Sequence, residues 1–421
     1  MPSSHPPKND PKTLIAWCLY DFANSIYVAV IPATVWSVYY ATQIVGNEEG
    51  LGDLWWGRVV STSMLTVAAT SPIMGALADT VGIRKKLLLT YTFLCVAGTC
   101  LLATVSPGML LWGFVLSVVA NVGLEGAMVF YNAYLPEIAS ADHLGRVSGW
   151  GFATGYAGSL LGLMVALPFV ERLRFDILWV LTGAAFLVFA LPAFAWLPKD
   201  APASLTAAQA ARKGAREAWH TLKDILTRPA LRRFMLAYFI YEDGVNTVIF
   251  FSSIFAATTL GFPFERLILL YAVVQVSALL GALAWAKPTD RLGPKFVVMA
   301  MLVQWSLVVA FVSQVQTQAQ FFVLAVAAGS GLGAIQAASR AFMSTLIPEG
   351  REGEFFGFYT LCGKSASVLG PLVFGGVSHA TGGDQRLAAL SVLVFYLVGG
   401  VILWPVKAGG PTIRAEKTSG A

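Results

Sequence analysis

Charged residues are scarce in this sequence and make up only 12% of its 421 residues. A soluble domain carries roughly 25% charged residues, so a water-soluble globular protein is excluded. Hydrophobic residues account for 57%, and they form long runs between short polar segments. Because a helix needs ~20 apolar residues to cross a bilayer, the sequence predicts an all-α, multi-pass membrane protein.

Side chains that hold metals or attack substrates are also scarce. The four cysteines lie inside apolar runs, and the four histidines lie in loops or the tail at no metal-site spacing. A phosphate-binding loop of the GxxxxGK[ST] type is missing from the sequence. The net charge of +5 is spread over short loops, which suits membrane topology better than nucleic-acid binding. We therefore expect no metal, no cofactor, no enzymatic activity and no nucleic-acid partner.

Twelve apolar runs can be drawn as membrane spans, six on each side of a polar middle segment. They cover approximately 13–42, 55–78, 87–106, 109–135, 147–170, 177–197, 231–258, 264–286, 296–314, 319–347, 354–378 and 387–406. The predicted organisation is a cytoplasmic tail (1–12), a first six-helix bundle (13–197), a cytoplasmic linker (198–230), a second six-helix bundle (231–406) and a cytoplasmic tail (407–421).

Lysine and arginine are distributed unevenly between the two sides of this topology. Cytoplasmic loops are enriched in both residues, and placing both termini in the cytoplasm puts nearly all loop bases on that side. The arginines left outside are Arg58, Arg172, Arg174, Arg266 and Arg386. We therefore expect a protein of the cell (inner) membrane with both termini cytoplasmic.

The run GALADTVGIRKK (75–86) places an acid, a turn glycine and three bases between the second and third spans. Gly75 lets two helices approach closely, and Gly82 permits a tight reversal. Arg84 and Lys85 hold the loop in the cytoplasm, which leaves Asp79 as a fixed charge at the membrane rim. We predict that these residues take part in gating.

A second, weaker copy of this loop, KPTDRLGPK (287–295), has Asp290, Arg291 and Gly293 as its gating candidates. Asp290 follows Asp79 by 290 minus 79, or 211 residues, which is half of the chain. The repeat extends further, since AWCLYD (16–21) corresponds to AYFIYE (237–242). The sequence therefore predicts two related halves with a site between them at mid-depth.

The 75–86 loop resembles the signature loop of the major facilitator superfamily. Five longer motifs are similar to the vacuole effluxer-like (autophagy-related) permease family: LYDFANS (19–25), FYNAYLPEIA (130–139), GRVSGWGFATGYAG (145–158), YEDGVNTVI (241–249) and IPEGREGEFFGFYTLCGKSASVLGP (347–371). The resemblance implies the major facilitator fold of two six-helix bundles and the activity of a permease. The family's vacuolar members export amino acids, which indicates a class of substrate. Ala286 departs from the pattern, which has a glycine four residues before Asp290.

Polar and charged side chains within the spans are candidates for the solute site, because a charge at the bilayer centre is costly and normally faces a cavity or a partner. Asp21 and Glu242 lie about 12 and 16 Å along their helices, at ~1.5 Å per residue, so both are deep. The predicted substrate or coupling residues are Tyr20, Asp21, Asn24, Glu125, Glu242, Asp243, Asn246 and Lys364.

Acids outnumber bases in this set. Its four acids face only Lys364 and Arg340, a further gating candidate, so full ionisation would leave two uncompensated negative charges in a low dielectric. One or more carboxylates should therefore bind a proton or a cationic group of the solute. An amino acid would fit, with its ammonium toward the acids and its carboxylate toward Lys364, and so would other solutes. Fixed interhelical pairs, such as Arg340 with Asp290, are the structural alternative.

Two expectations concern helix geometry. Asp243, beside Gly244, is expected to mark a local break in the seventh span, as discontinuous helices often do near transport sites. Asp79 is expected to pair with the start of the eleventh span near Glu354 and Phe355, where a helix dipole favours an anion.

The sequence thus predicts a secondary transporter that moves a small polar solute by alternating access. Export or exchange of an amino acid or similar metabolite, coupled to protons, is the first candidate activity. Uptake of a sugar or organic anion is the second, and a membrane receptor or enzyme that has lost transport is the alternative from another class. We expect a monomer whose partners are a small solute, protons and membrane lipids.

The charge distribution predicts that His220 is cytoplasmic and Asp176 extracellular. Cysteines placed singly at these positions and treated with an impermeant thiol reagent on whole cells should react only at 176. Permeabilised cells are the control, in which both positions should react. Reaction at 220 on intact cells would overturn the orientation.

Overall fold

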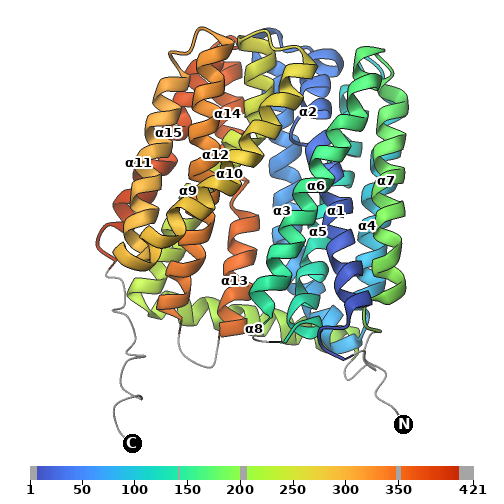
Figure 1. Cartoon of the computed structure of the whole chain (residues 1–421), viewed down its shortest axis with the longest axis vertical. Helices are drawn as coiled ribbons and strands as arrows, with labels where there is room; N and C mark the ends of the chain where they lie inside the picture. Colours follow the sequence, from blue (N-terminus) through green and yellow to red (C-terminus); the bar gives the residue numbers. More distant parts are fainter. Residues whose placement is uncertain (1–6, 141–142, 200–205, 348–351, 407–421) are drawn as a thin grey trace, which may run out of the picture.

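The computed structural model describes residues 7–140, 143–199, 206–347 and 352–406. These residues form helices and connecting loops, with no β-strand among them. The helices run side by side in two bundles, coloured blue to green and yellow to red in Figure 1. Together they make the all-α fold of twelve spans in two six-helix bundles that the sequence predicts.

The first bundle begins with an interrupted span. Helix α1 (Pro11–Val30) is followed by four turn residues, then by α2 (Val35–Tyr39) and the π-helical segment η1 (Tyr40–Val45). The span predicted over 13–42 is present as one membrane span, Pro11–Val45, but its helix is interrupted. Pro32 supplies the reason, because proline cannot donate the N–H that continues a helix. The remaining elements of this bundle are η2 (Glu48–Gly50), α3 (Leu51–Val81), α4 (Arg84–Leu101), η3 (Leu102–Thr104), α5 (Leu110–Ile138), α6 (Leu144–Glu171) and α7 (Phe175–Trp196).

The second bundle also contains an interrupted span. Its elements are α9 (Pro229–Thr259), α10 (Phe264–Leu292), α11 (Pro294–Val312), α12 (Gln318–Leu346), α13 (Glu352–Ser365), α14 (Leu369–Ala380) and α15 (Gln385–Leu403). The prediction of one helix over 354–378 is corrected at residues 366–368, where Pro371 lacks the N–H that would bond back across the gap. In contrast, α9 continues through Asp243 and Gly244, so the break predicted in the seventh span is wrong.

Length and composition account for the spans. Ten of the described helical segments are long and apolar enough to cross a membrane. The 31-residue α3 and the split pair α13 and α14 complete the twelve. In the sequence, a further helix, α8 (Ala207–Thr227), lies between the two bundles and begins with a capping box made by Thr206 and Gln209.

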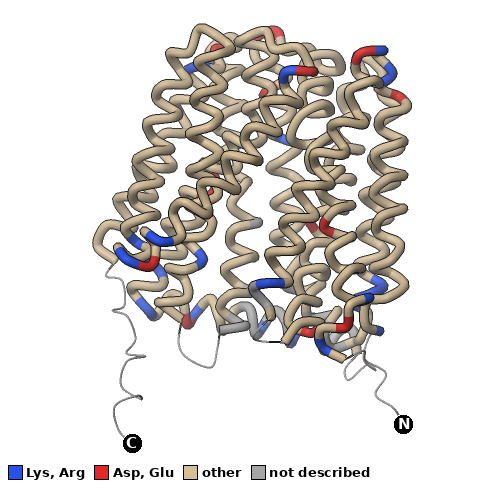
Figure 2. The backbone as a smooth tube through the Cα atoms, in the orientation of Figure 1, with Lys and Arg blue, Asp and Glu red and all other residues tan. Residues whose placement is uncertain are grey.

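The helices share two ends, which we call the terminal end and the far end. The terminal end is the one at which α1 begins. The ends of α5 and α7 lie there as well, because Lys8 Nζ donates to Pro136 O at 3.1 Å and Thr13 Oγ1 donates to Trp196 O at 3.4 Å. Helix α8 lies across this end (Figure 1). Lysine and arginine positions gather here as well (Figure 2). The far end is the opposite one and carries η2 and the loop between α14 and α15.

Local signals set several helix ends. Asp10 caps α1 by accepting hydrogen bonds from the Thr13 hydroxyl at 2.8 Å and the Thr13 N–H at 3.0 Å, and these bonds lower the pKa of the Asp10 carboxyl. Gly82 ends α3 with a φ of 67°, and Gly293 ends α10 with a φ of 87°. Because only glycine adopts a positive φ without steric cost, the two repeated loops turn at corresponding positions.

Glycines let two helices of the first bundle, α1 and α6, approach closely. Gly151, Gly155, Gly158 and Gly162 line one face of α6, against α1. A Cβ built on Gly158 would lie 2.2 Å from the Phe22 carbonyl oxygen. Such small-residue faces permit the backbone contact that holds membrane helices together.

Gly158→Ala should destabilise the protein, because the added methyl group would collide with a backbone atom and only a shift of α1 could relieve the contact. We expect a loss of about 1–3 kcal/mol in the free energy of unfolding, seen as a lower thermal midpoint in detergent.

Gly149→Ala is the matched control on α6, since nothing lies within 4 Å of its added Cβ. Alanine favours a helix over glycine, so the control should keep or raise the midpoint. A Gly158→Ala protein as stable as the wild type would contradict the close packing of α1 and α6.

Candidate functional site

Glu242 lies near the middle of α9 with only 5% of its surface exposed. Its Oε1 accepts a hydrogen bond from Gln336 Nε2 of α12 at 2.5 Å. The neighbouring Tyr241 hydroxyl lies 2.6 Å from Ser339 Oγ, also on α12. Neutral polar groups therefore hold α9 and α12 together around an acid. Gln336 was not among the predicted site residues, although its position one turn before Arg340 on the same helix could have indicated it.

Asp243, the next residue, accepts hydrogen bonds from backbone N–H groups at the break in the eleventh span. Its Oδ1 accepts the N–H of Gly370 at 2.9 Å, and its Oδ2 accepts the N–H of Leu369 at 3.1 Å. Asn246 Nδ2 donates to Ala366 O at 3.1 Å, on the other side of the break. One face of α9 thus satisfies backbone donors and acceptors that the break releases. The carboxylate also lies at the N-terminus of α14, where the helix dipole favours a negative charge.

The corresponding position in the first half carries Phe22 instead of an acid. Its backbone packs against Gly158 of α6, which is continuous, so no free N–H groups require an acceptor there. In the second half, a Cβ at Gly370 would lie 1.9 Å from Thr247 Oγ1, so glycine is needed for α14 to start so close to α9. The exchange of Phe22 for Asp243 therefore accompanies the change from a continuous helix to a broken one.

Asp21 is the counterpart of Glu242 in the first half. Asn24 Nδ2 donates to Asp21 Oδ1 at 3.1 Å and to Tyr20 O at 3.0 Å. The second carboxylate oxygen faces α6, because a Cβ built on Gly151 would lie 3.1 Å from Asp21 Oδ2. The structure thus brings Asp21 and Asn24 together at the contact of α1 with α6.

Tyr20 is fully buried inside the first bundle. Its hydroxyl lies 2.6 Å from Thr92 Oγ1 of α4, and its ring stacks on Tyr131 with 5.0 Å between centroids. Trp17 stacks on Tyr131 at 4.7 Å and donates to its carbonyl at 3.2 Å. The hydroxyl of Tyr20 is therefore engaged between helices of its own bundle.

Glu125 lies on α5, half-buried and within electrostatic range of Tyr27 and Cys95. One turn earlier on α5, Asn121 Oδ1 accepts the Tyr27 hydroxyl at 2.8 Å. These contacts direct Asn121 toward α1, and Glu125 toward α1 and α4.

The gating candidates of the first loop are tied to their own bundle. Arg84 pairs with Glu137 at 2.5 Å, and Lys85 Nζ donates to Leu197 O at 2.7 Å. Nothing lies within 4 Å of a Cβ built on Gly75, so the close approach predicted for it does not occur among the described residues. The two bonds join the start of α4 to the ends of α5 and α7.

Three other gating candidates have exposed side chains, and the side chain of a fourth, Asp79, is not among those that the structure describes. Asp290, Arg291 and Arg340 are exposed, and the structure has no ion pair between the described side chains of Asp290 and Arg340. The side chains of Asp79 and Lys364 lie outside the described part of the structure. The pairing expected of Asp79 therefore stays a prediction.

Toward the far end, the two bundles are joined at both helix breaks. Ser253 Oγ of α9 donates to the carbonyl of Ala33, within the first break, at 2.6 Å. Ser61 Oγ of α3 donates to the carbonyl of Val368, within the second break, at 2.7 Å. Each break is thus stabilised by a serine from the opposite bundle.

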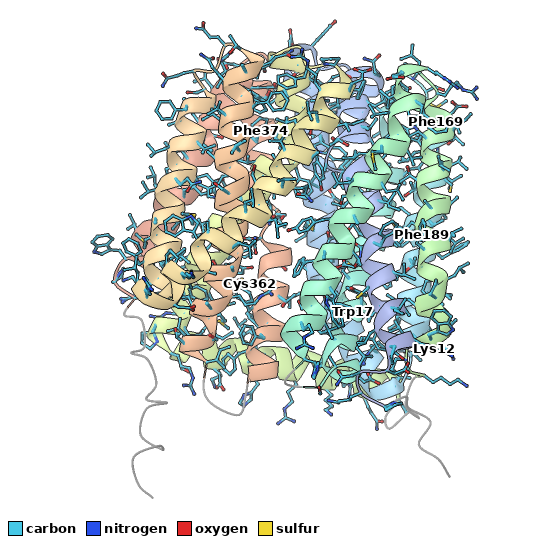
Figure 3. All side chains as sticks on the ribbon, in the orientation of Figure 1. Lys12, Trp17, Phe169, Phe189, Cys362 and Phe374 are labelled. Carbon is cyan, nitrogen blue, oxygen red and sulfur yellow. The ribbon has the colours of Figure 1, made fainter. Side chains whose placement is uncertain are left out.

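A cavity of about 300 Å³ lies mainly in the second bundle and reaches Val28 of α1. Aliphatic and aromatic side chains form most of its wall, including Phe374, which lies closer to the far end than Trp17 and Cys362 (Figure 3). The polar members of the wall are neutral, among them Ser252, Tyr271 and Gln275, and no charged residue belongs to it among those that the structure describes. The cavity therefore suits an uncharged or apolar group.

Comparison with known proteins agrees with this architecture. The chain matches the family described as vacuole effluxer Atg22 like over residues 58–410. It is 29% identical to the MFS-type transporter YxiO of Bacillus subtilis over 400 residues, which covers 92% of this chain and 93% of the relative. It is 24% identical to autophagy-related protein 22 of Vanderwaltozyma polyspora over 406 residues, which covers 86% of this chain and 75% of the relative.

Solved structures share the fold. The nucleoside transporter NupG aligns over 94% of this chain and 98% of its own, with a TM-score of 0.71 and 15% identity. A D-xylose-proton symporter aligns over 94% of this chain and 98% of its own, with a TM-score of 0.68 and 18% identity. The family match spans most of the chain, and the protein therefore belongs to the vacuole effluxer Atg22-like family of MFS-type transporters.

Proposed function

We propose that this protein is a proton-coupled exporter or exchanger of amino acids or similar small metabolites, working by alternating access. The observation that carries the proposal is the cluster at mid-depth in the second bundle. There Glu242 binds Gln336 while its neighbour Asp243 holds the broken eleventh span. Discontinuous helices and embedded acids at this depth are typical of solute and coupling sites in secondary transporters.

Glu242 is assigned the coupling role. Its partner Gln336 is a neutral amide, which donates to the carboxyl group whether that group is ionised or protonated. Loss of the charge would therefore leave the hydrogen bond in place, and the acid can exchange a proton without separating α9 from α12. The counterpart Asp21, half-buried on α1, is assigned the corresponding role in the first bundle.

Asp243 is assigned a structural role instead. It accepts two backbone N–H groups of α14, and protonation of one oxygen would replace an acceptor with a donor facing an N–H. The ionised form matches the site, so this residue braces the break while Glu242 exchanges protons.

An amino acid fits the polar and apolar parts of this region together. Its ammonium would face Asp21 or Glu242, and its carboxylate would face Lys364. The cavity further along α9, with Ile249 and Ser252 in its wall, would take a neutral side chain. We further propose that the two bundles, 13–197 and 231–406, move as units about the 198–230 linker. The terminal end would face the cytoplasm, with Asp79 and its counterpart Asp290 in the gate at that end.

Uptake of an uncharged solute such as a sugar is the second candidate. The observation that favours it is the neutral wall of the 300 Å³ cavity. The two candidates differ in what they require of the acids, since a sugar brings no ammonium group to them.

Purified protein in proteoliposomes should exchange radiolabelled neutral amino acids, with a rate that depends on pH, and protein-free vesicles supply the blank. Glu242→Gln should abolish the pH dependence while the protein stays folded, because the amide keeps a polar side chain of similar size but cannot exchange a proton. An unchanged pH profile in this variant would refute the coupling role. Exchange of sugars without amino acids would favour the second candidate.

Asp243→Asn is the matched comparison at the adjacent position. Its amide can accept one N–H of α14 but presents its own donor to the other, so we expect a rate about tenfold lower from the lost charged hydrogen bond. Its pH profile should remain that of the wild type. If this variant loses the pH dependence and Glu242→Gln keeps it, the roles of the two acids are reversed.

A further inference from the structure

A second acid, not singled out by the sequence pattern, is fully buried at the far end. Asp53 lies in the first turn of α3 with no exposed surface. Ser378 Oγ of α14 donates to its Oδ2 at 2.5 Å, and Gln385 Nε2 of α15 lies 2.9 Å from both of its oxygens. Asn47 Nδ2, from its own bundle, donates to its Oδ1 at 3.2 Å. One carboxylate of the first bundle thus accepts donors from two helices of the second.

The orientation of both amide partners is set by other bonds. Gln385 Oε1 accepts the hydroxyl of Thr259 at 2.5 Å, so its Nε2 must face Asp53. Asn47 Oδ1 accepts the backbone N–H of Asp53 at 2.9 Å, so its Nδ2 must face the carboxylate. Both oxygens of Asp53 therefore meet donors, and an ionised carboxylate, which only accepts, matches this site.

The backbones of the two bundles pack closely around Asp53. A Cβ at Gly375 of α14 would lie 2.6 Å from the Asp53 carbonyl oxygen, and a Cβ at Gly50 would lie 2.6 Å from Ser378 Oγ. Beside them, His379 Nδ1 lies 2.9 Å from the carbonyl of Glu49, which adds a further contact between the bundles. The far end is closed at this point by direct contact of α3 and η2 with α14.

Two arginines at the far end, Arg58 and Arg386, make contacts away from Asp53. Arg58 lies over the ring of Trp55 at 4.7 Å, and Arg386 donates to the carbonyl of Ser313 at 3.0 Å. The Asp53 charge is balanced by neutral donors and by the N-terminal dipole of α3. Opening the far end would break the bonds to Ser378 and Gln385 and expose the carboxylate to water, which would donate hydrogen bonds in their place.

We propose that Asp53 is the latch of the far end, whose hydrogen bonds to Ser378 and Gln385 set the balance between the closed far end and the open one. The inference rests on alternating access as the proposed function and names a residue that controls it. Asp53 acts by positioning α14 and α15 against α3 and does not need to touch the solute.

Accessibility of a buried interface residue measures this balance. Ser253 is 3% exposed and contacts the opposite bundle, so Ser253→Cys reports opening of the far end. In a chain whose four native cysteines are replaced by alanine, an impermeant thiol reagent is added from the far-end side. Asp53→Asn should raise the labelling rate at position 253 about tenfold, because the amide presents a donor to groups that are themselves donors.

Asp176→Asn is the matched control. Asp176 is an acid near the far end whose side chain is 55% exposed and pairs with Arg174 on the surface, so the labelling rate should not change. An unchanged rate in folded Asp53→Asn protein, with folding checked by its thermal midpoint, overturns the latch.

Ser378→Ala keeps the test decisive if Asp53→Asn does not fold. It removes one donor and leaves the charge, so we expect a rise of about threefold, and an unchanged rate overturns the proposal. The labelling requires no solute. A chain that shows the rise but transports nothing in vesicles overturns the proposed function alone, whereas normal transport without the rise overturns the latch alone.

Discussion

Backbone groups released by a helix break have to find partners inside the protein, because the hydrocarbon core offers none. Among the described residues, the first span and the eleventh each contain such a break. The Ala33 carbonyl of the first is bound by Ser253, and the free N–H groups at the second are bound by Asp243. The depth of the candidate site and the contact between the bundles follow from where these bonds form.

The same requirement explains why two related halves have different interiors. Where α6 is continuous, it needs no acceptor, and the Phe22 backbone packs directly on Gly158. Where the eleventh span is broken, the corresponding residue is Asp243, and its charge lies at the N-terminus of α14. A duplicated sequence has thus kept its helix order while one exchange changed a packing contact into a hydrogen-bonded one. The second half therefore has an acid, Asp243, without an acidic counterpart in the first half.

The two ends of the protein use charge differently. At the terminal end, Lys287, Asp290 and Arg291 of the 287–295 loop are exposed, and an exposed ion pair contributes little stability. At the far end, Asp53 is fully buried and bound by neutral donors from both bundles. A buried and satisfied carboxylate holds one arrangement of helices far more selectively than exposed charges do, because separation strands its donors. The closed far end therefore rests on few, specific bonds.

Apolar run lengths were enough to predict the twelve spans, and the two similar loops that turn at Gly82 and Gly293 indicated the repeat, because these signals act over a few residues. The family came from the resemblance of longer motifs to those of known permeases. The hydrogen-bond partners of the buried acids could not be predicted from the sequence. Asp243 was expected to break its own helix, yet it binds Gly370, 127 residues later in the chain. Asp53 was not predicted as a functional residue, because an acid at the end of a span is usually exposed. In the tertiary structure, α14 and α15 cover it. The sequence by itself determined which segments cross the membrane and which residues could carry charge there. Only the tertiary structure decided which polar groups meet, because hydrogen bonds depend on distances between helices that are remote in sequence.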